Sequence, residues 1–340
     1  MTLVLVASYL EPACVERIRT EVPSVEVVYE PHLLPEPRYK ADHIGNPRLL
    51  SQPDTDRWEK LLGAADVMFD FDWAHPSLMP QRCPNLRWVQ ATSAGIGEVV
   101  QEAGLTNAPF VVTTAAGVHA GPLSEFVVGG MLYLIKGFPL MERQKSKKHW
   151  QRYSGGELSG KRATIVSVGS VGRHVGRTLS HLGVTVTGVS RRSDQATPDG
   201  FEAIVPVDEL ERALSGTDLL VICSPLTPQT RNLIGERELE LLKPGAIVTN
   251  IGRGPVIDER ALLRLLDTGH LAGAVLDVFE QEPLPPESPF WELPNVVVSP
   301  HSGSTTEGEN NRITSLFIDN LQRFLEHRPL VNLYEADRGY

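Results

Sequence analysis

Cysteine is scarce in this chain, and basic charge does not dominate it. The 340 residues include three cysteines, Cys14, Cys83 and Cys223, without the spacing of a disulfide framework or a metal site. We therefore expect reduced thiols, a reducing compartment such as the cytoplasm, and no bound metal. The formal net charge is −10, which argues against the broad basic surface that nucleic acid or an anionic membrane would attract. Small anions must then be bound by local groups of residues.

Long apolar runs are also missing. The first ten residues lack a basic start, and their apolar run is broken at Ser8, which predicts a buried strand rather than a signal peptide. The run from Phe126 to Ile135 ends at Lys136 and is too short to span a bilayer. We expect no membrane partner.

Short β-branched segments recur between helical stretches, which predicts an α/β fold with doubly wound parallel sheets. The predicted strands are Leu3–Val6, Val25–Tyr29, Val67–Phe69, Leu86–Val89, Phe110–Thr113, Ala163–Val168, Val184–Val189, Leu219–Cys223, Ile247–Asn250, Gly273–Leu276 and Val296–Ser299. A long helical stretch, about Pro122 to Lys148, separates the two groups of strands and predicts two domains. The amphipathic stretch Thr305–His327 has an apolar face for packing on the first sheet. The segment Pro31–Pro53 has few apolar residues and is interpreted as a solvated loop.

A glycine turn follows the strand predicted at Ala163–Val168. Ser167-Val168-Gly169-Ser170-Val171-Gly172 leads into a helical pattern, which is the order that a dinucleotide-binding fold requires. Gly169 would let the backbone approach a pyrophosphate, Gly172 would let helix and strand pack closely, and Ser170 and Val171 begin the helix whose N–H groups favour phosphate. Ser167 replaces the first glycine of the usual fingerprint, where we expect a tight turn but no need for a positive φ. An ordinary turn between strand and helix is the alternative.

The next predicted strand ends at Val189, where an NAD site would present an acidic residue to the ribose hydroxyls. Ser190, Arg191 and Arg192 stand there instead. A hydroxyl and two guanidinium groups suit a 2′-phosphate, which they would bind through charge-assisted hydrogen bonds. We therefore predict that NADP(H) is preferred and that NAD(H) is possible. The alternative is that the two arginines belong to a solvated turn.

Three charged or titratable residues follow strands of the second half, at the ends where open α/β sheets bind ligands. Arg253 can bind the carboxylate of a keto acid and polarise its carbonyl. His301 can give the proton that keto reduction requires, and Glu282 can stabilise the protonated imidazole and fix its tautomer. Asp277, at the end of a buried strand, either bonds the nicotinamide carboxamide or caps the following loop.

The segments around these residues, Asn250–Gly254, Leu276–Leu284 and Ser299–Gly303, resemble the D-isomer-specific 2-hydroxyacid dehydrogenases in order and spacing. The resemblance implies that Arg253 binds substrate, that His301 is the acid/base, and that Glu282 rather than Glu280 is its partner. It also implies a Rossmann-type coenzyme domain, residues 121–299, inserted into a flavodoxin-like substrate domain made of residues 1–120 and 300–340.

Further site residues are implied by the same resemblance. Backbone N–H groups at Ala94-Gly95-Ile96 would bind the substrate carboxylate, and a homodimer would form through the Pro122–Lys148 stretch. The residues expected to line the coenzyme are Cys223, Ser224, Pro225, Thr230, Ile251, Gly252, Asp277 and Gly303. Val118–Glu125 and Phe290-Trp291 look most like the glyoxylate and hydroxypyruvate reductase branch.

The predicted function is therefore NADPH-dependent reduction of a small 2-keto acid, such as glyoxylate or hydroxypyruvate, to the D-2-hydroxy acid. Two alternatives stay open. One is a corepressor-like protein of this fold that binds dinucleotide without turnover, and the other is an oxidoreductase of another small anion. The identity of the acid would depend on side chains of the first domain, and the candidates are Trp73, Trp150 and Trp291.

Overall fold

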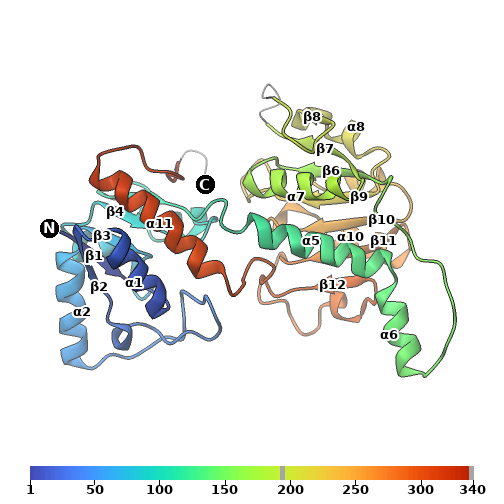
Figure 1. Ribbon diagram of the computed structural model, residues 1–340. Coiled ribbons are helices and arrows are strands. Elements are labelled where there is room, and N and C mark those ends of the chain that lie inside the picture. Colours follow the sequence, from blue (N-terminus) through green and yellow to red (C-terminus); the bar gives the residue numbers. More distant parts are fainter. Residues whose placement is uncertain (192–195, 337–340) are drawn as a thin grey trace. The chain divides into compact units, whose positions relative to one another are not determined.

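A computed structural model describes residues 1–191 and 196–336. Arg192, one of the residues predicted to bind a 2′-phosphate, lies outside the described residues. The chain divides into two compact units (Figure 1). The first contains Met1–His119 and the chain from Thr305 onward, and the second contains Ala120–Ser304. The second boundary thus falls at 304/305 rather than at 299/300, so the loop that carries His301 belongs to the second unit. Which unit binds substrate stays a prediction.

The first unit is built on a parallel sheet with the strand order β2-β1-β3-β4-β5. Its strands are β1 (Thr2–Val6), β2 (Val25–Val28), β3 (Val67–Phe69), β4 (Trp88–Gln90) and β5 (Val111–Thr113), and its helices are α1 (Pro12–Glu21), α2 (Gln52–Ala64), α3 (Met79–Arg82), α4 (Gly97–Glu102) and α11 (Glu309–Leu325). This is the flavodoxin-like order, which the family resemblance implied. Its direction reverses between β1 and β3, and such a switch point at the carboxyl ends of the strands is where ligands bind in open α/β sheets.

Helix α11 packs on the first sheet, as its apolar face predicted. Phe317 is fully buried, stacks on Trp88 with ring centroids 5.3 Å apart, and meets the edge of Phe69 at the same distance. Burying one such ring contributes about 1.5–3 kcal/mol. In Figure 1 the red α11 runs beside α1, which it contacts. A helix from late in the chain is thereby packed on strands β3 and β4 of the first sheet.

The segment between β2 and α2 is a loop in which most residues are exposed, as its composition predicted, but it is built around one buried carboxylate. Asp42 is 3% exposed and accepts hydrogen bonds from the Arg38 guanidinium at 2.7 and 3.0 Å. It also accepts the backbone N–H groups of Ile44 and Gly45. These bonds hold the pKa of Asp42 well below its ordinary value although burial opposes the shift. Hydrogen bonds to one buried carboxylate therefore hold the loop, in addition to the buried side chains of Leu33 and Leu34.

The second unit contains a parallel sheet with the order β12-β11-β10-β9-β6-β7-β8. Its strands are β6 (Arg162–Val166), β7 (Thr185–Val189), β8 (Ala203–Val205), β9 (Leu219–Ile222), β10 (Ala246–Asn250), β11 (Leu271–Leu276) and β12 (Val296–Val298), and its helices are α5 (Ala120–Ile135), α6 (Phe138–Ser146), α7 (Ser170–His181), α8 (Leu210–Leu214), α9 (Glu236–Glu240) and α10 (Glu259–Asp267). Within the sheet, the six neighbouring strands β8-β7-β6-β9-β10-β11 follow the Rossmann order, and β12 adds one strand beyond β11. The sequence missed β8, because an edge strand of three residues gives little periodic signal.

The long helical stretch predicted between the two groups of strands is two helices rather than one. Gly137 has φ +73° and separates α5 from α6, because a left-handed residue cannot continue a right-handed helix. No single helix in residues 1–191 and 196–336 is long and apolar enough to cross a membrane. The bent pair α5 and α6 meets that criterion by length and composition only. A homodimer through this stretch stays a prediction.

Candidate active site

The glycine turn of the second unit joins β6 to α7. A Cβ atom on Gly172 would lie 2.1 Å from the backbone oxygen of Ser167, so only glycine allows this approach of helix to strand. A Cβ atom on Gly169 would meet no described atom within 4 Å. No described side chain caps the start of α7, and its first N–H groups, which include those of Ser170 and Val171, are available to an anion. The turn therefore fits the pyrophosphate of a dinucleotide.

Ser167 corrects one expectation from the sequence. Its φ is +78°, so the turn does require the left-handed region that the first glycine of the fingerprint would normally supply. Serine adopts this conformation at a cost of roughly 1–2 kcal/mol. The departure from the fingerprint is thus a change of side chain on an unchanged backbone geometry.

The end of β7 carries the predicted selector of the coenzyme. Ser190 is half-buried and its N–H donates to the Val205 carbonyl at 3.0 Å. Arg191 is exposed and lies in a bend. A hydroxyl and a guanidinium therefore lie at this edge of the sheet. Neither Ser190 nor Arg191 is the acidic residue that an NAD site would present.

The loops that follow β9 and β10 pack against each other. A Cβ atom on Gly252 would lie 2.5 Å from the Ser224 carbonyl. Thr230 shapes the first loop, because its hydroxyl donates to the Pro225 carbonyl at 2.7 Å and accepts the Thr227 N–H at 2.8 Å. Burial raises the pKa of the neighbouring Cys223 thiol to about 12, so it stays protonated. Ile251, predicted beside the coenzyme, is 7% exposed.

Arg253 stands three residues beyond β10. The Asn250 side chain fixes the backbone on both sides: its oxygen accepts the Gly252 N–H at 3.1 Å and its amide donates to the Arg253 carbonyl at 3.0 Å. The next residue, Gly254, touches the Phe279 backbone so closely that any Cβ atom would overlap it. The Arg253 loop is therefore seated directly against the loop that carries Glu282.

Glu282 and His301 come together beyond β11 and β12. His301 Nδ1 lies 2.8 Å from Glu282 Oε2, and Glu282 Oε1 accepts the Phe279 N–H at 3.0 Å. Burial raises the pKa of Glu282, but these two hydrogen bonds and the charges of His301 and Arg253 outweigh burial and lower it below its ordinary value. An ionised carboxylate accepts, so Nδ1 carries a proton and Nε2 is the nitrogen left for chemistry. Glu280, by contrast, is exposed and donates its N–H to Glu259.

Asp277 builds the loop that presents His301. Its Oδ1 accepts the Ser299 hydroxyl at 2.6 Å and the N–H groups of Ser302 and Gly303 at 2.9 and 2.8 Å. Its backbone carbonyl accepts the His301 N–H, and His301 itself has φ +54°. Of the two roles that the sequence left open for Asp277, the geometry supports the cap of the following loop.

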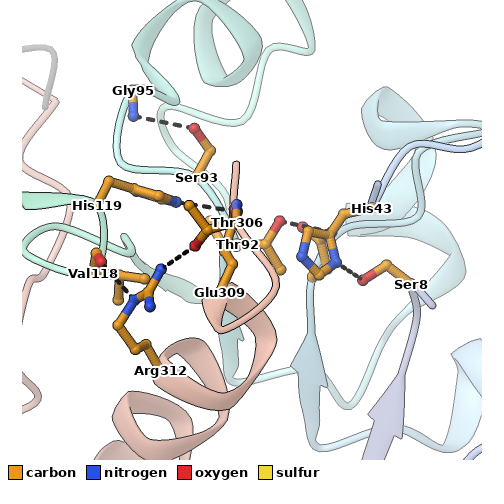
Figure 2. Close-up of polar contacts among 12 residues, drawn as sticks. Ser8, His43, Thr92, Ser93, Gly95, Val118, His119, Thr306, Glu309 and Arg312 are labelled. Carbon is orange, nitrogen blue, oxygen red and sulfur yellow. Dashed lines mark hydrogen bonds and ion pairs between the residues drawn. The ribbon is translucent and has the colours of Figure 1, made fainter. Parts of the chain in front are cut away.

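In the first unit, Ala94 and Gly95 follow β4 in the loop before α4. The Gly95 N–H donates to the Ser93 hydroxyl at 3.3 Å, and Gly95 itself is exposed (Figure 2). The sequence missed the residue that supports this loop. Thr92 is buried and donates to Asp70, which is 0% exposed and directly follows β3. A carboxylate right after a buried strand was the available signal.

No group of three or more metal-ligating side chains occurs within the described ranges. A family model for the NAD-binding domain of D-isomer-specific 2-hydroxyacid dehydrogenases matches residues 128–303. A glyoxylate/hydroxypyruvate reductase of Arabidopsis thaliana is 32% identical over 258 residues, 75% of this chain and 78% of the relative.

Two solved structures extend the similarity to almost the whole chain. A D-isomer-specific 2-hydroxyacid dehydrogenase family protein of Aeromonas salmonicida is 31% identical, with a TM-score of 0.81 and 99% of each chain covered. An NADPH-dependent glyoxylate/hydroxypyruvate reductase of Sinorhizobium meliloti, solved with NADP and sulfate, is 27% identical, with a TM-score of 0.78 and 100% of each chain covered.

The family match and the relatives, together with two parallel-sheet units and a dinucleotide turn, place the chain among the NAD(P)-dependent oxidoreductases. More particularly, the chain belongs to the D-isomer-specific 2-hydroxyacid dehydrogenase family.

Proposed function

We propose that this oxidoreductase reduces a small 2-keto acid, of the size of glyoxylate or hydroxypyruvate, to the D-2-hydroxy acid with NADPH. The observation that carries the proposal is the pair of His301 Nδ1 and Glu282 Oε2 at 2.8 Å, beside Arg253 at the carboxyl edge of the second sheet. Reduction of a keto group needs a proton for the oxygen and a cation for the carboxylate, and this edge supplies both.

The chemistry divides among three side chains. The reduced nicotinamide, when bound, supplies a hydride to the carbonyl carbon. His301 gives its Nε2 proton to the carbonyl oxygen, and Glu282 holds the imidazole by Nδ1 and stabilises its charged form. Arg253 binds the substrate carboxylate and polarises the carbonyl. The backbone N–H groups of Ala94 and Gly95 are assigned to the same carboxylate.

The coenzyme preference rests on Ser190 and Arg191, since a guanidinium attracts a 2′-phosphate where an acidic side chain would repel it. The Sinorhizobium meliloti relative is described as NADPH-dependent and was solved with NADP, which supports the same preference here. The turn Gly169–Gly172 and the loops at Ser224 and Gly252 would hold the rest of the dinucleotide. Arg191→Ala should raise the KM for NADPH at least tenfold and leave the KM for NADH within twofold. An equal change for both coenzymes would refute the assignment.

Turnover decides the main proposal. Wild-type protein should oxidise NADPH in the presence of glyoxylate, hydroxypyruvate or a larger 2-keto acid, and chiral analysis should find the D product. His301→Asn should lower kcat by about 100-fold or more while NADPH still binds, because it removes the proton donor and leaves the coenzyme site intact. Absence of turnover across the panel, or kcat within tenfold of wild type in His301→Asn, would contradict the proposal.

A further inference from the structure

Asp70 has a conformation and an environment that lower the stability of the first unit. Its side chain is fully buried, its φ is +72°, and its Oδ1 makes no hydrogen bond to any described atom. Burial raises the pKa of this carboxyl, although the charge of His43 and bonds from Trp73, Phe71 and Thr92 oppose the shift. Backbone strain and an incompletely bonded buried carboxyl both cost stability, and such costs gather at functional sites.

The position of Asp70 in the sheet suggests a functional reason for this loss of stability. It directly follows β3, next to β1, at the point where the order of the first sheet reverses. Open α/β sheets bind their ligands at this place. Ser8, beyond β1, is 3.1 Å from His43 Nδ1, and His43 Nε2 is also buried without a partner in the described chain. Figure 2 shows Ser8 and Thr92 on either side of the His43 ring.

The other carboxyl oxygen holds two segments at once. Asp70 Oδ2 accepts the Trp73 indole N–H at 2.9 Å and the Thr92 hydroxyl at 3.0 Å. Trp73 lies in the loop after β3, and Thr92 begins the loop that continues to Ala94 and Gly95. One buried oxygen therefore orients both an aromatic ring and the segment assigned to the substrate carboxylate.

We propose that Asp70 is a positioning residue for the substrate, acting through Thr92 on the segment Ser93–Gly95 and through Trp73 on the neighbouring loop. The inference rests on the proposed function, in which Ala94 and Gly95 bind the keto acid. It assigns Asp70 to substrate binding and not to coenzyme binding or to the chemical step.

Asp70→Asn tests the inference, because asparagine tolerates a positive φ and carries no buried charge. Its amide oxygen can accept both donors in place of Oδ2, but hydrogen bonds to a neutral oxygen are roughly half as strong as those to a charged one, so both loops are held less firmly. We expect the KM for the keto acid to rise about tenfold, with kcat within threefold and the Kd for NADPH, measured by fluorescence titration, within twofold. The Tm should equal or exceed that of wild type, whereas a purely structural carboxylate would lower it.

Matched variants separate positioning from general damage. Asp66→Asn changes a carboxylate at the opposite end of β3, which accepts the Leu3 N–H, and should leave the KM within twofold. Thr92→Val removes the hydroxyl at constant shape and should raise the KM, whereas Thr92→Ser keeps the hydroxyl and should not. If Asp70 acts through Thr92, Asp70→Asn and Thr92→Val should be less than additive in the double variant.

Hydrogen exchange of the substrate-free protein gives a readout that does not need turnover. Asp70→Asn should speed exchange at Ser93–Gly95 and leave α4 beyond it unchanged. Unchanged exchange there, an unchanged KM in both Asp70→Asn and Thr92→Val, or an equal rise in Asp66→Asn would overturn the inference. A wild-type protein without keto acid turnover would refute the proposed function instead, and the exchange result would still decide whether Asp70 positions the segment.

Discussion

Replacement of Glu282 by glutamine gives the most direct test of the catalytic pair. The carboxylate accepts two N–H donors, from His301 and Phe279, at 2.8 and 3.0 Å. A glutamine side chain has one accepting oxygen, so its NH2 group must face one of these donors. The variant therefore loses one hydrogen bond and the negative charge while its size stays the same.

The magnitude follows from the exposure of the pair. Opposite charges 4 Å apart attract by about 4 kcal/mol at an effective dielectric constant of 20 and by about 1 kcal/mol in water. His301 and Glu282 are 44% and 37% exposed, so screening brings their attraction to about 1–2 kcal/mol. Each 1.4 kcal/mol is a factor of ten. Allowing also for a poorly oriented imidazole, we expect kcat to fall about 10-fold to 100-fold.

The assay is steady-state NADPH oxidation with the best keto acid, accompanied by the KM for each substrate. Both KM values should stay within threefold, because neither Arg253 nor the dinucleotide turn is changed. Glu280→Gln is the matched control: it removes a carboxylate two residues away that does not pair with His301, and should keep kcat within twofold. A Glu282→Gln enzyme with kcat within twofold of wild type would refute the role given to the pair.

Three further predictions concern stability and the shape of the site. Ser167→Gly relieves the φ of +78° and should raise the free energy of unfolding by about 0.5–1 kcal/mol in urea titrations; a loss of stability would contradict the strain. Asp277→Ala leaves three donors of the His301 loop unpaired and should cost about 3 kcal/mol and lower kcat at least tenfold, whereas Asp277→Asn, which keeps the accepting oxygen, should lose less than half of that stability; equal losses would argue against the cap. Because folding lowers the pKa of Glu282 below its ordinary value of 4.5, its stabilisation is present above that pH and is lost as the pH falls through the folded value. The difference in unfolding free energy between wild type and Glu282→Gln should therefore shrink below pH 4.5, and a difference that grows in acid would refute the sign.

The carboxyl ends of the strands could be predicted, because short apolar runs in the local sequence mark where each strand ends. Apolar runs rich in β-branched residues mark β6, β10, β11 and β12, and a parallel sheet brings the carboxyl ends of neighbouring strands to one edge. Arg253, Glu282 and His301 could therefore be assigned to one edge before any coordinates were known. The family resemblance implied that Glu282, and not Glu280, would face His301, and the 2.8 Å contact agrees with that pairing.

Other features depend on contacts between distant segments, which no local pattern contains. Composition indicated that residues 31–53 are mostly exposed, which is correct, but it gave no sign of the bonds of Asp42 to Arg38 and to backbone N–H groups, which form only when the segment folds back on itself. The positive φ of Ser167 and the close approach of Gly172 to its carbonyl are seen only in the folded turn. The role of Asp70 could not be predicted from the local sequence, since its partner Thr92 is 22 residues away.

The sequence by itself thus determined the α/β class, the positions of most strands along the chain and the identity of the side chains at the edge of the second sheet, because periodicity and turn residues are local properties. Tertiary structure alone decided that Asp277 caps the His301 loop, that Gly137 divides the long helical stretch, and that one buried oxygen of Asp70 joins two loops. These three features depend on contacts that form only after the chain has folded, and the burial of each group determines how strong its hydrogen bonds are.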